Sequence, residues 1–229
     1  MIGACASENG RDSMPQTTTQ ILVTSEAGDK LAPMENVAFQ TGRASGTVVS
    51  IDPDATRQVI QGIGSSFTES SAFVLAHLAP DQRREVMEKI YGETGANFSL
   101  TRTHIGACDF SVEGKYSYAD VPGDSKLESF TIAPDRAGFD PERYPGIQDP
   151  DFDLLPMIHE ALAIKEGQDD RDLRIIASAW TAPPWMKDIE TWFIPGSDEN
   201  GWQGTGGSLK PGFESTYADY LVKYLEAYR

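Results

Sequence analysis

The chain has 229 residues, of which 39% are hydrophobic and 10% aromatic, so it is long enough for one large or two modest soluble domains with a packed core. Its 35 acidic and 19 basic residues give a formal net charge of −16, and Lys and Arg form no cluster, which argues against a nucleic-acid partner. No apolar run approaches the roughly 20 residues of a membrane-spanning helix, so we expect no transmembrane span. Neutral ligands are compatible with this charge.

The first residues of the chain are small and polar, and we expect residues 1–18 to be disordered. Their sequence, MIGACASENGRDS, is similar to the end of a bacterial lipoprotein signal, in which Cys5 would carry a lipid anchor. This interpretation predicts a protein of the bacterial cell envelope or a secreted protein. The alternative is a disordered terminus with an incidental cysteine.

Cysteine and histidine residues are few and scattered. Cys5 and Cys108 lie far apart in dissimilar surroundings, which argues against a disulfide framework, and we interpret Cys108 as a small buried residue. His77, His104 and His159 include no pair at helical spacing. We therefore expect no metal and no cofactor.

Two kinds of strand are predicted. Segments 21–25 (ILVTS) and 47–51 (TVVSI) are short, β-rich and separated by Gly, Asp and Pro, which is typical of an antiparallel sheet. So small a sheet needs a larger body to pack on. Buried strands of another kind are predicted at 58–63, at 97–105 and at the start of 173–187, which reads LRIIASAWTAPPWMK.

Helices are predicted after these strands. The first runs to Leu78 from a cap at Thr68 or Ser70, and the second starts at Pro80 and ends near Gly92. Two later helices are predicted from apolar and aromatic residues three and four positions apart, namely Leu154, Leu155, Ile158 and Leu162, and then Tyr217, Tyr220, Leu221, Tyr224, Leu225 and Tyr228. Alternating strands and helices predict a parallel α/β domain. Its last helix would leave a sheet edge open, so we expect a chain cut from a longer protein.

Candidate site residues follow the predicted strands. In βα proteins ligands bind at the carboxyl ends of strands, and Arg102 and His104 lie near one such end. His104 could equally be a hydrogen-bonded core residue. Residues 106–150 form a long connection whose aromatic content predicts an ordered, functional excursion. Trp180 follows the small residues Ala-Ser-Ala, and we expect it to form a wall for a flat, half-apolar ligand such as a sugar ring.

Four stretches of the chain resemble glycoside hydrolase family 30, the glucosylceramidase group of retaining β-glycosidases. They occur in the family's order and cover most of residues 58–229. The stretches are GIGSSFTESSA (62–72), LTRTHIGACDFSVEGKYSYADVPGD (100–124), SAWTAPPWMK (178–187) and TYADYLVKYLEAY (216–228). The resemblance implies a TIM barrel with an attached β-sandwich.

The fold class implied by this resemblance is α/β. We expect a partial TIM (β/α)8 barrel, made of its first three βα units and preceded by strands of the attached β-sandwich. Residues 19–57 would supply the first strands of the sandwich. Residues 58–229 would form the N-terminal part of the glycosidase barrel.

The resemblance also assigns substrate-binding residues. Asp109 would accept hydrogen bonds from sugar hydroxyls, and Trp180 would offer its indole N–H and its ring to the same sugar. Arg102 matches an arginine near the family's catalytic centre, where it would position carboxylates by bidentate hydrogen bonds. Phe110 and Trp185 would line the pocket.

Structural alternatives exist for most of these residues. Asp109 could form a turn or cap a helix, Trp180 could pack in the core and Trp185 could brace its loop. Arg102 could belong to a buried ion pair. Outside the predicted site, Glu69 could line the barrel mouth, although we prefer it as a helix cap.

The family's catalytic pair consists of a glutamate acid/base in an Asn-Glu-Pro context and a glutamate nucleophile. Retaining chemistry needs these two carboxyl groups about 5 Å apart. The glutamates after Trp180 lack that context, namely Glu190, Glu199, Glu214 and Glu226. We therefore expect the catalytic glutamates beyond Arg229, and we expect the 229 residues alone to be inactive.

The sequence thus predicts the N-terminal portion of a retaining β-glycosidase that hydrolyses a β-linked glucoside or glucan. The resemblance leaves open whether the substrate is a glucosylceramide or a β-1,6-glucan, and β-xylosidase and fucosidase activities also occur in the family. The alternative is a non-catalytic carbohydrate-binding or structural module that retains the aromatic residues of the site and lacks the catalytic carboxylates.

Overall fold

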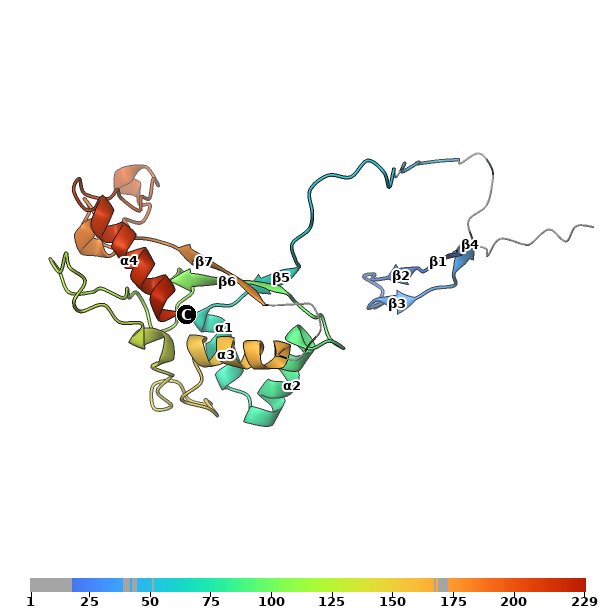
Figure 1. The fold of residues 1–229 in the computed structure, drawn as a ribbon, viewed down its shortest axis with the longest axis horizontal. Helices are drawn as coiled ribbons and strands as arrows, with labels where there is room; N and C mark the ends of the chain where they lie inside the picture. The colour runs from blue at the N-terminus through green and yellow to red at the C-terminus, as the bar shows by residue number, and fades with distance from the viewer. Residues whose placement is uncertain (1–17, 39–41, 43–44, 51, 167, 169–172) are drawn as a thin grey trace, which may run out of the picture. The chain divides into compact units, whose positions relative to one another are not determined.

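The structure, a computed structural model, describes residues 18–38, 42, 45–50, 52–166, 168 and 173–229. Cys5 and most of the segment predicted to be disordered lie outside the described residues. The chain divides into two compact units, with the boundary between Gln58 and Val59 (Figure 1). None of the helices in the described part is long and apolar enough to cross a membrane.

The first unit contains two small antiparallel sheets. Strand β1 (Thr18–Thr19) pairs with β4 (Val37–Ala38), and β2 (Leu22–Val23) pairs with β3 (Ala32–Pro33). The predicted strand at 21–25 is confirmed in its central residues, and the expected antiparallel pairing is confirmed as well.

Two other predicted strands are wrong. Residues 47–50 belong to none of the ladders between described residues, and Val48 and Val49 are 59% and 80% exposed. Residues 58–63 form no strand either, and the sheet of the second unit begins only at Gly64. β-Branched residues favour an extended backbone, but a strand also needs a partner that accepts and donates its ladder hydrogen bonds.

The second unit contains a parallel sheet with the strand order β5, β6, β7. These strands span Gly64–Ser66, Leu100–Ile105 and Arg174–Ala179. β5 and β6 approach each other closely, since a Cβ atom on Gly64 would lie 1.4 Å from the carbonyl oxygen of Leu100. Glycine is therefore required where β5 begins. The predicted parallel α/β class is confirmed for this unit.

One or two helices follow each strand of the sheet, as the sequence predicts (Figure 1). They are α1 (Glu69–Ala76) and α2 (Pro80–Tyr91) after β5, α3 (Leu154–Lys165) after β6, and α4 (Glu214–Ala227) after β7. Short 3-10 turns interrupt the long connections at Ala133–Arg136 (η1), Pro184–Met186 (η2) and Asp198–Asn200 (η3).

The predicted helix boundaries agree with local capping. Thr68, not Ser70, is the N-cap of α1, and its Oγ1 accepts a hydrogen bond from the backbone N–H of Ser71 at 3.3 Å. Pro80 is the first residue of α2 and Gly92 follows its last residue. These ends were predictable because caps depend on residues within one turn of the boundary.

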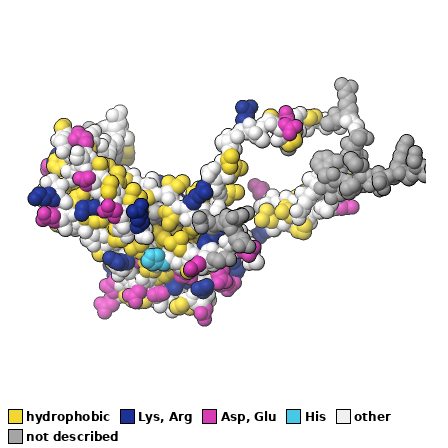
Figure 2. Space-filling view, viewed as in Figure 1, with side chains coloured by type: hydrophobic (Ala, Val, Ile, Leu, Met, Phe, Trp, Pro, Cys, Tyr) yellow, Lys and Arg dark blue, Asp and Glu magenta, His cyan; other side chains and the backbone are white. Residues whose placement is uncertain are grey.

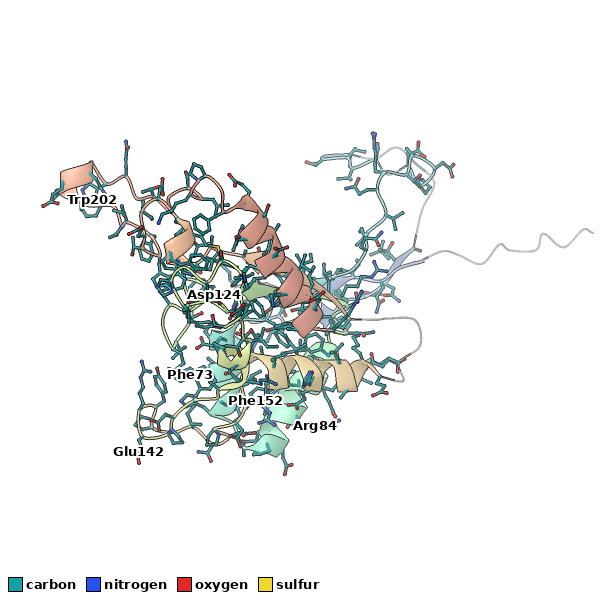
Figure 3. The ribbon with its side chains drawn as sticks, turned by 60° about the vertical axis from the view of Figure 1, so that its left-hand side comes forward. Phe73, Arg84, Asp124, Glu142, Phe152 and Trp202 are labelled. Carbon is teal, nitrogen blue, oxygen red and sulfur yellow. The ribbon has the colours of Figure 1, made fainter. Side chains whose placement is uncertain are left out.

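Helices α1, α2 and α3 share an apolar core below the sheet in the view of Figure 1. Arg83 of α2 lies at the edge of this core and contacts both acidic and aromatic side chains. Its guanidinium pairs with Asp149 and, at 3.0 Å, with Glu160 of α3, and lies 3.9 Å from the ring centroid of Phe152, which Figure 3 labels. The largest buried members of the core are Phe67, Met87, Tyr91, Phe139, Phe152, Leu154 and Met157.

Acidic and basic side chains are mixed on the face of the second unit that Figure 2 shows. The described residues form no extended basic patch on that face.

A second core surrounds Asp135 of η1, which is fully buried. Its carboxylate accepts hydrogen bonds from the hydroxyls of Tyr116 at 2.8 Å, Tyr118 at 2.5 Å and Tyr228. The ring of Tyr118 also stacks on Tyr224 of α4, with a centroid separation of 5.7 Å. Burial raises the pKa of Asp135. Asp135 therefore links the connection after β6 to the end of α4.

Replacing Asp135 by Ala should lower the free energy of unfolding by at least about 3 kcal/mol, because the three buried tyrosine hydroxyls lose their shared acceptor. Urea unfolding of the variant and the native protein measures this difference. Asp219→Ala is the control, since Asp219 lies exposed on α4 and its loss should change stability little. Equal stability of both variants would contradict the assigned role of Asp135.

Asp153 caps α3 and is also buried. Its carboxylate accepts hydrogen bonds from the backbone N–H groups of Leu154 at 2.7 Å and Gly138 at 3.0 Å. Burial raises the pKa of Asp153 from its ordinary value of 3.8 to about 6. Between these values the folded protein holds a proton that the unfolded chain has lost, so the contribution of Asp153 to stability falls as pH rises through this range.

Asp153→Asn should become more stable relative to the native protein as pH increases from about 4 to about 6, because asparagine keeps a capping oxygen and carries no charge. Urea unfolding at a series of pH values measures the difference. Asp219→Asn, at an exposed position, should show no such trend. A stability difference for Asp153→Asn that does not change with pH would disprove the shift.

Candidate functional site

The carboxyl ends of β6 and β7 meet at one edge of the parallel sheet. Their register pairs Ile105 with Ala179, so the segments that follow the two strands start side by side. Gly106 turns the chain after β6 with a φ of +70°, and a Cβ atom there would lie 3.2 Å from the carbonyl oxygen of Tyr116. Trp180 follows β7 directly. This edge is where parallel α/β proteins bind ligands.

A hollow of about 360 Å³, which we call the first hollow, lies among these segments. Asp109 and Trp180 both line it, and Trp180 is 37% exposed, so a ligand can reach its ring. The volume falls within the range of about 300–1,000 Å³ that is usual for small-molecule sites. The complete lining is Ala107, Cys108, Asp109, Lys115, Trp180, Thr181, Trp192, Phe193 and Gly206.

Arg102 belongs to this site through Trp180. Its guanidinium carbon lies 4.2 Å from the ring centroid of Trp180, which is the geometry of a cation–π contact. Arg102 is exposed, so its charge needs no buried partner of the kind that the structural alternative supposes. Its guanidinium lies over one face of the Trp180 ring.

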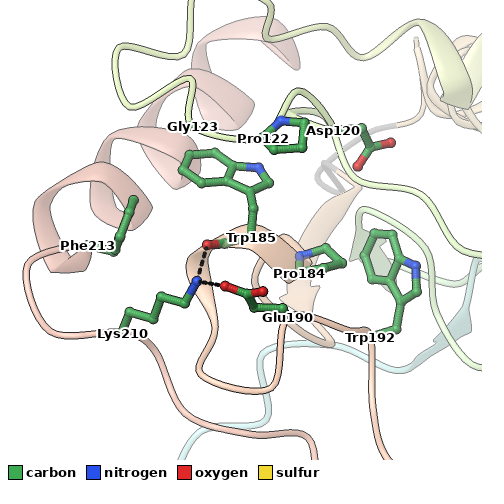
Figure 4. Close-up of a pocket in the computed structure, with 9 residues that line it drawn as sticks. All are labelled: Asp120, Pro122, Gly123, Pro184, Trp185, Glu190, Trp192, Lys210 and Phe213. Atoms are coloured by element: carbon green, nitrogen blue, oxygen red, sulfur yellow. Dashed lines mark hydrogen bonds and ion pairs between the residues drawn. The ribbon is translucent and has the colours of Figure 1, made fainter.

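The other two predicted residues lie elsewhere. Phe110 is 69% exposed and does not line the first hollow. Trp185 lines a separate hollow of about 600 Å³, which we call the second hollow and which Figure 4 shows. The indole N–H of Trp185 donates to the carbonyl oxygen of Ala119 at 2.8 Å. The structure thus groups Asp109 and Trp180 and places Trp185 beside them in another hollow.

Several residues of the first hollow escaped the sequence analysis, among them Lys115, Thr181, Trp192 and Phe193. Trp192 and Phe193 belong to the Trp- and Gly-rich connection after β7, and adjacent aromatic residues in a connection at this end of a sheet are a usable signal. The carbonyl oxygen and N–H of Ile194 bond to Thr205, which closes this connection into a hairpin-like loop.

The buried side chain of Lys187 links this loop to the residues that follow β7. It is 3% exposed, and its ammonium donates to Thr181 Oγ1 at 2.6 Å, to the carbonyl oxygen of Trp192 at 2.6 Å and to that of Gly206 at 2.8 Å. Burial lowers the pKa of Lys187. Thr181, Trp192 and Gly206 all line the first hollow, so the buried ammonium of Lys187 fixes the positions of three lining residues.

Glu69 supports the opposite connection, and its prediction as a helix cap is wrong. Thr68 caps α1, while the buried carboxylate of Glu69 accepts hydrogen bonds from the backbone N–H groups of Val112 at 2.6 Å and Glu113 at 2.9 Å. Burial raises the pKa of Glu69. The carboxylate thus fixes the residues that follow Asp109, and the contact spans more than 40 positions, which local sequence patterns do not reveal.

His104 is a buried core residue beneath the site, as one of the two sequence alternatives states. Its Nε2 accepts a hydrogen bond from the N–H of Glu69 at 3.0 Å, and its Nδ1 lies 2.6 Å from the carbonyl oxygen of Gly106. An N–H can only donate, so Nε2 is the acceptor and Nδ1 carries the proton. Burial lowers the pKa of His104, which keeps the ring neutral.

Asp109 is the one carboxylate among the described residues that line the first hollow. A single carboxylate can bind hydroxyl groups, but acid–base chemistry with an acid and a nucleophile needs a second one. Within the described ranges, no group of three or more His, Cys, Asp or Glu side chains is placed to hold a metal ion. One carboxylate beside exposed indole and phenyl rings is suited to binding a flat ligand that has both an apolar face and hydroxyl groups.

Comparison with known proteins gives one family. Residues 60–229 match the model of the glycosyl hydrolase family 30 TIM-barrel domain. The lysosomal acid glucosylceramidase of Mus musculus is 30% identical over 196 residues, which cover 83% of this chain and 32% of the relative. An endo-1,6-β-D-glucanase of Aspergillus fumigatus is 28% identical over 207 residues, which cover 86% of this chain and 38% of the relative.

Solved structures show the same fold. SrfJ from Salmonella typhimurium matches 93% of this chain and 40% of its own with a TM-score of 0.70 and 23% identity. An endo-β1,6-glucanase matches 91% of this chain and 39% of its own with a TM-score of 0.61 and 25% identity. The chain spans about a third of the length of the curated relatives that it matches.

Replacing Lys187 by Met should loosen the wall of the first hollow, because three oxygen acceptors lose their buried donor. We expect faster amide exchange across residues 188–208 and a loss of about 1–3 kcal/mol in the free energy of unfolding. Hydrogen exchange read by mass spectrometry localises the effect. Lys126→Met, at an exposed lysine, is the matched control. Unchanged exchange in Lys187→Met would refute the role of the ammonium.

Proposed function

Because the chain belongs to glycosyl hydrolase family 30, we propose that it supplies the sugar-binding part of a retaining β-glycosidase. The observation that carries the proposal is the convergence of Asp109 and Trp180 in the first hollow, at the carboxyl ends of neighbouring parallel strands. The family's members in the comparisons are glycoside hydrolases, which supports hydrolysis of a glycosidic bond as the reaction of the whole protein.

The two residues have complementary tasks in this proposal. The carboxylate of Asp109 accepts hydrogen bonds from sugar hydroxyls, and the ring of Trp180 packs against the apolar face of the sugar. Arg102 positions the Trp180 ring by its cation–π contact. Lys187 holds Trp192 and Gly206 on the other connection, so these lining residues are already in place before the sugar binds.

The hydrolytic step needs more carboxylates than the first hollow contains. A retaining mechanism uses an acid/base and a nucleophile about 5 Å apart, and Asp109 alone lines the described part of the hollow. We place both catalytic glutamates outside these 229 residues, in a longer protein whose (β/α)8 barrel begins with the three βα units seen here. By this proposal the 229 residues alone bind sugar and do not hydrolyse it.

Other parts of the chain fit a longer enzyme. Residues 19–57 would supply the first strands of an attached β-sandwich, and the antiparallel pairs within this first unit support that proposal. The substrate would be a β-linked glucoside or glucan, since the relatives are named glucosylceramidase and endo-1,6-β-D-glucanase. A lipid anchor on Cys5 and a place in the cell envelope, or secretion, complete this proposal on the basis of the N-terminal sequence.

A second function has one specific observation in its favour, the single carboxylate in the described lining of the first hollow. It is a non-catalytic module that binds β-linked carbohydrate. The two functions differ in one measurement on the whole protein that carries this chain. A module binds β-glucosides and never cleaves them, whereas the enzyme releases the aglycone.

Asp109→Ala should reduce kcat/KM for an aryl β-glucoside by about 100-fold in the whole protein, which corresponds to about 2.7 kcal/mol of lost charge-assisted hydrogen bonding. Release of the aryl group measures the rate. Asp219→Ala removes an exposed aspartate of α4 and serves as the control, with an unchanged rate. A fully active Asp109→Ala variant would remove Asp109 from the sugar site.

A further inference from the structure

The second hollow has no role in the function proposed above. Its volume is about 600 Å³, which is larger than that of the first hollow. It lies between the connection after β6 and the connection after β7, and Figure 4 shows Phe213 and Trp192 on opposite sides of Trp185. The full lining is Asp120, Pro122, Gly123, Pro184, Trp185, Glu190, Trp192, Lys210 and Phe213.

The two hollows are neighbours on the same end of the sheet. Trp192 lines both of them, so the two hollows adjoin at this residue. The other lining residues of the second hollow come from the same two connections that carry Asp109 and Trp180. A ligand longer than one sugar ring that occupies the first hollow would therefore meet the second hollow at Trp192.

The aromatic residues of the second hollow offer ring faces more than polar atoms. The N–H of Trp185 is already bonded to the carbonyl oxygen of Ala119 at 2.8 Å, so its remaining contribution is apolar. Phe213 packs edge-on against Trp185, with ring centroids 5.5 Å apart at 80°, which fixes the two rings at an angle. Rings held in this way form a rigid apolar wall.

The polar residues of the hollow keep bonding capacity for a ligand. Lys210 donates to Glu190 and, at 3.2 Å, to the carbonyl oxygen of Trp185, and an ammonium has a third hydrogen to give. The side chain of Glu190 is 70% exposed, so its carboxylate can accept further bonds. Asp120 accepts from the N–H and the hydroxyl of Ser117 and, as a carboxylate, has room for more.

We propose that the second hollow is a sugar subsite, which binds the glucosyl residue next to the one held in the first hollow. The inference rests on the proposed function and makes its substrate class a β-linked glucan. Aromatic faces interleaved with donors and acceptors match a sugar, which has apolar C–H faces and a rim of hydroxyls.

An acyl chain is the other occupant to weigh, since a glucosylceramide places its lipid next to the sugar. An acyl chain in the second hollow would cover Asp120, Glu190 and Lys210 without bonding to them. Removing charged groups from water without a hydrogen-bonding partner is unfavourable, whereas sugar hydroxyls replace the water that these groups lose. The lining therefore favours the glucan.

The test compares three ligands that resist hydrolysis, by calorimetric titration of the whole protein that carries this chain. They are methyl β-thioglucoside, its S-linked β-1,6 disaccharide and octyl β-thioglucoside. We expect the disaccharide to bind about tenfold more tightly than the monosaccharide, which is about 1.4 kcal/mol. Glu190→Gln and Phe213→Ala should each abolish most of this gain and leave the monosaccharide affinity unchanged.

Two features keep the test decisive. Glu190 is exposed, so Glu190→Gln folds even if the loss of the Phe213 ring destabilises α4. Trp202→Ala is the matched aromatic control, because Trp202 is 73% exposed on the same loop and lines neither hollow. This variant should keep the full gain of the disaccharide.

The possible failures are distinguishable. A monosaccharide that binds while the disaccharide gains nothing overturns the subsite and leaves the proposed function intact. A larger gain for the octyl glucoside than for the disaccharide overturns it in favour of an apolar aglycone site. A monosaccharide that does not bind at all, with no effect of Asp109→Ala, overturns the proposed function and this inference with it.

Discussion

The fully buried carboxylate of Asp135 is the interaction on which the shape of the site depends. It accepts hydrogen bonds from Tyr116, Tyr118 and Tyr228, and so joins the connection after β6 to the end of α4. The consequence reaches Asp109 through the backbone, because the carbonyl oxygen of Tyr116 accepts a hydrogen bond from the N–H of Ala107 at 2.9 Å. The turn that presents Asp109 is thus closed by a tyrosine that Asp135 holds.

Two other buried charged side chains, those of Glu69 and Lys187, likewise hold segments outside helices and strands in place. The carboxylate of Glu69 binds the backbone of Val112 and Glu113, and the ammonium of Lys187 binds the backbone of Trp192 and Gly206. Long connections contain backbone N–H and C=O groups that form no hydrogen bonds within a helix or sheet. Burying such a group without a hydrogen-bond partner destabilises the folded protein. A charged side chain offers several strong hydrogen bonds from one point, and its own burial is tolerated because those bonds are made.

The sequence predicted what depends on neighbouring residues and missed what depends on distant ones. Thr68, Pro80 and Gly92 marked helix ends correctly, since a cap is decided within one turn. A strand was predicted at 58–63 because this segment contains β-branched residues that favour an extended backbone. The prediction was wrong because the strand also needs a partner, and the pairing with β6 begins only where Gly64 meets Leu100. The residues of the site were likewise predicted where local sequence is sufficient and missed where distant contacts decide.

Within the site, Trp180 was predicted from its place directly after a strand, whereas Asp109 was predicted only through the family resemblance, and the structure brings both to the first hollow. Trp185 lies only five positions after Trp180, yet the turn η2 at Pro184–Met186 directs it into another hollow. The partners of Lys187 were beyond prediction, because its three acceptors lie 5 to 19 positions away along a loop with no periodic pattern.

One segment, residues 180–213, controls both hollows through its two buried or half-buried lysines. Lys187 ties Trp192 and Gly206 to the first hollow, and Lys210 ties Glu190 and the carbonyl oxygen of Trp185 to the second. Trp192 lines both hollows, so a shift of this residue alters both. Asp109 lies on a different connection, where other contacts hold its neighbours Cys108 and Val112. Changes in this loop can therefore alter both hollows while the connection that carries Asp109 keeps its own supporting contacts.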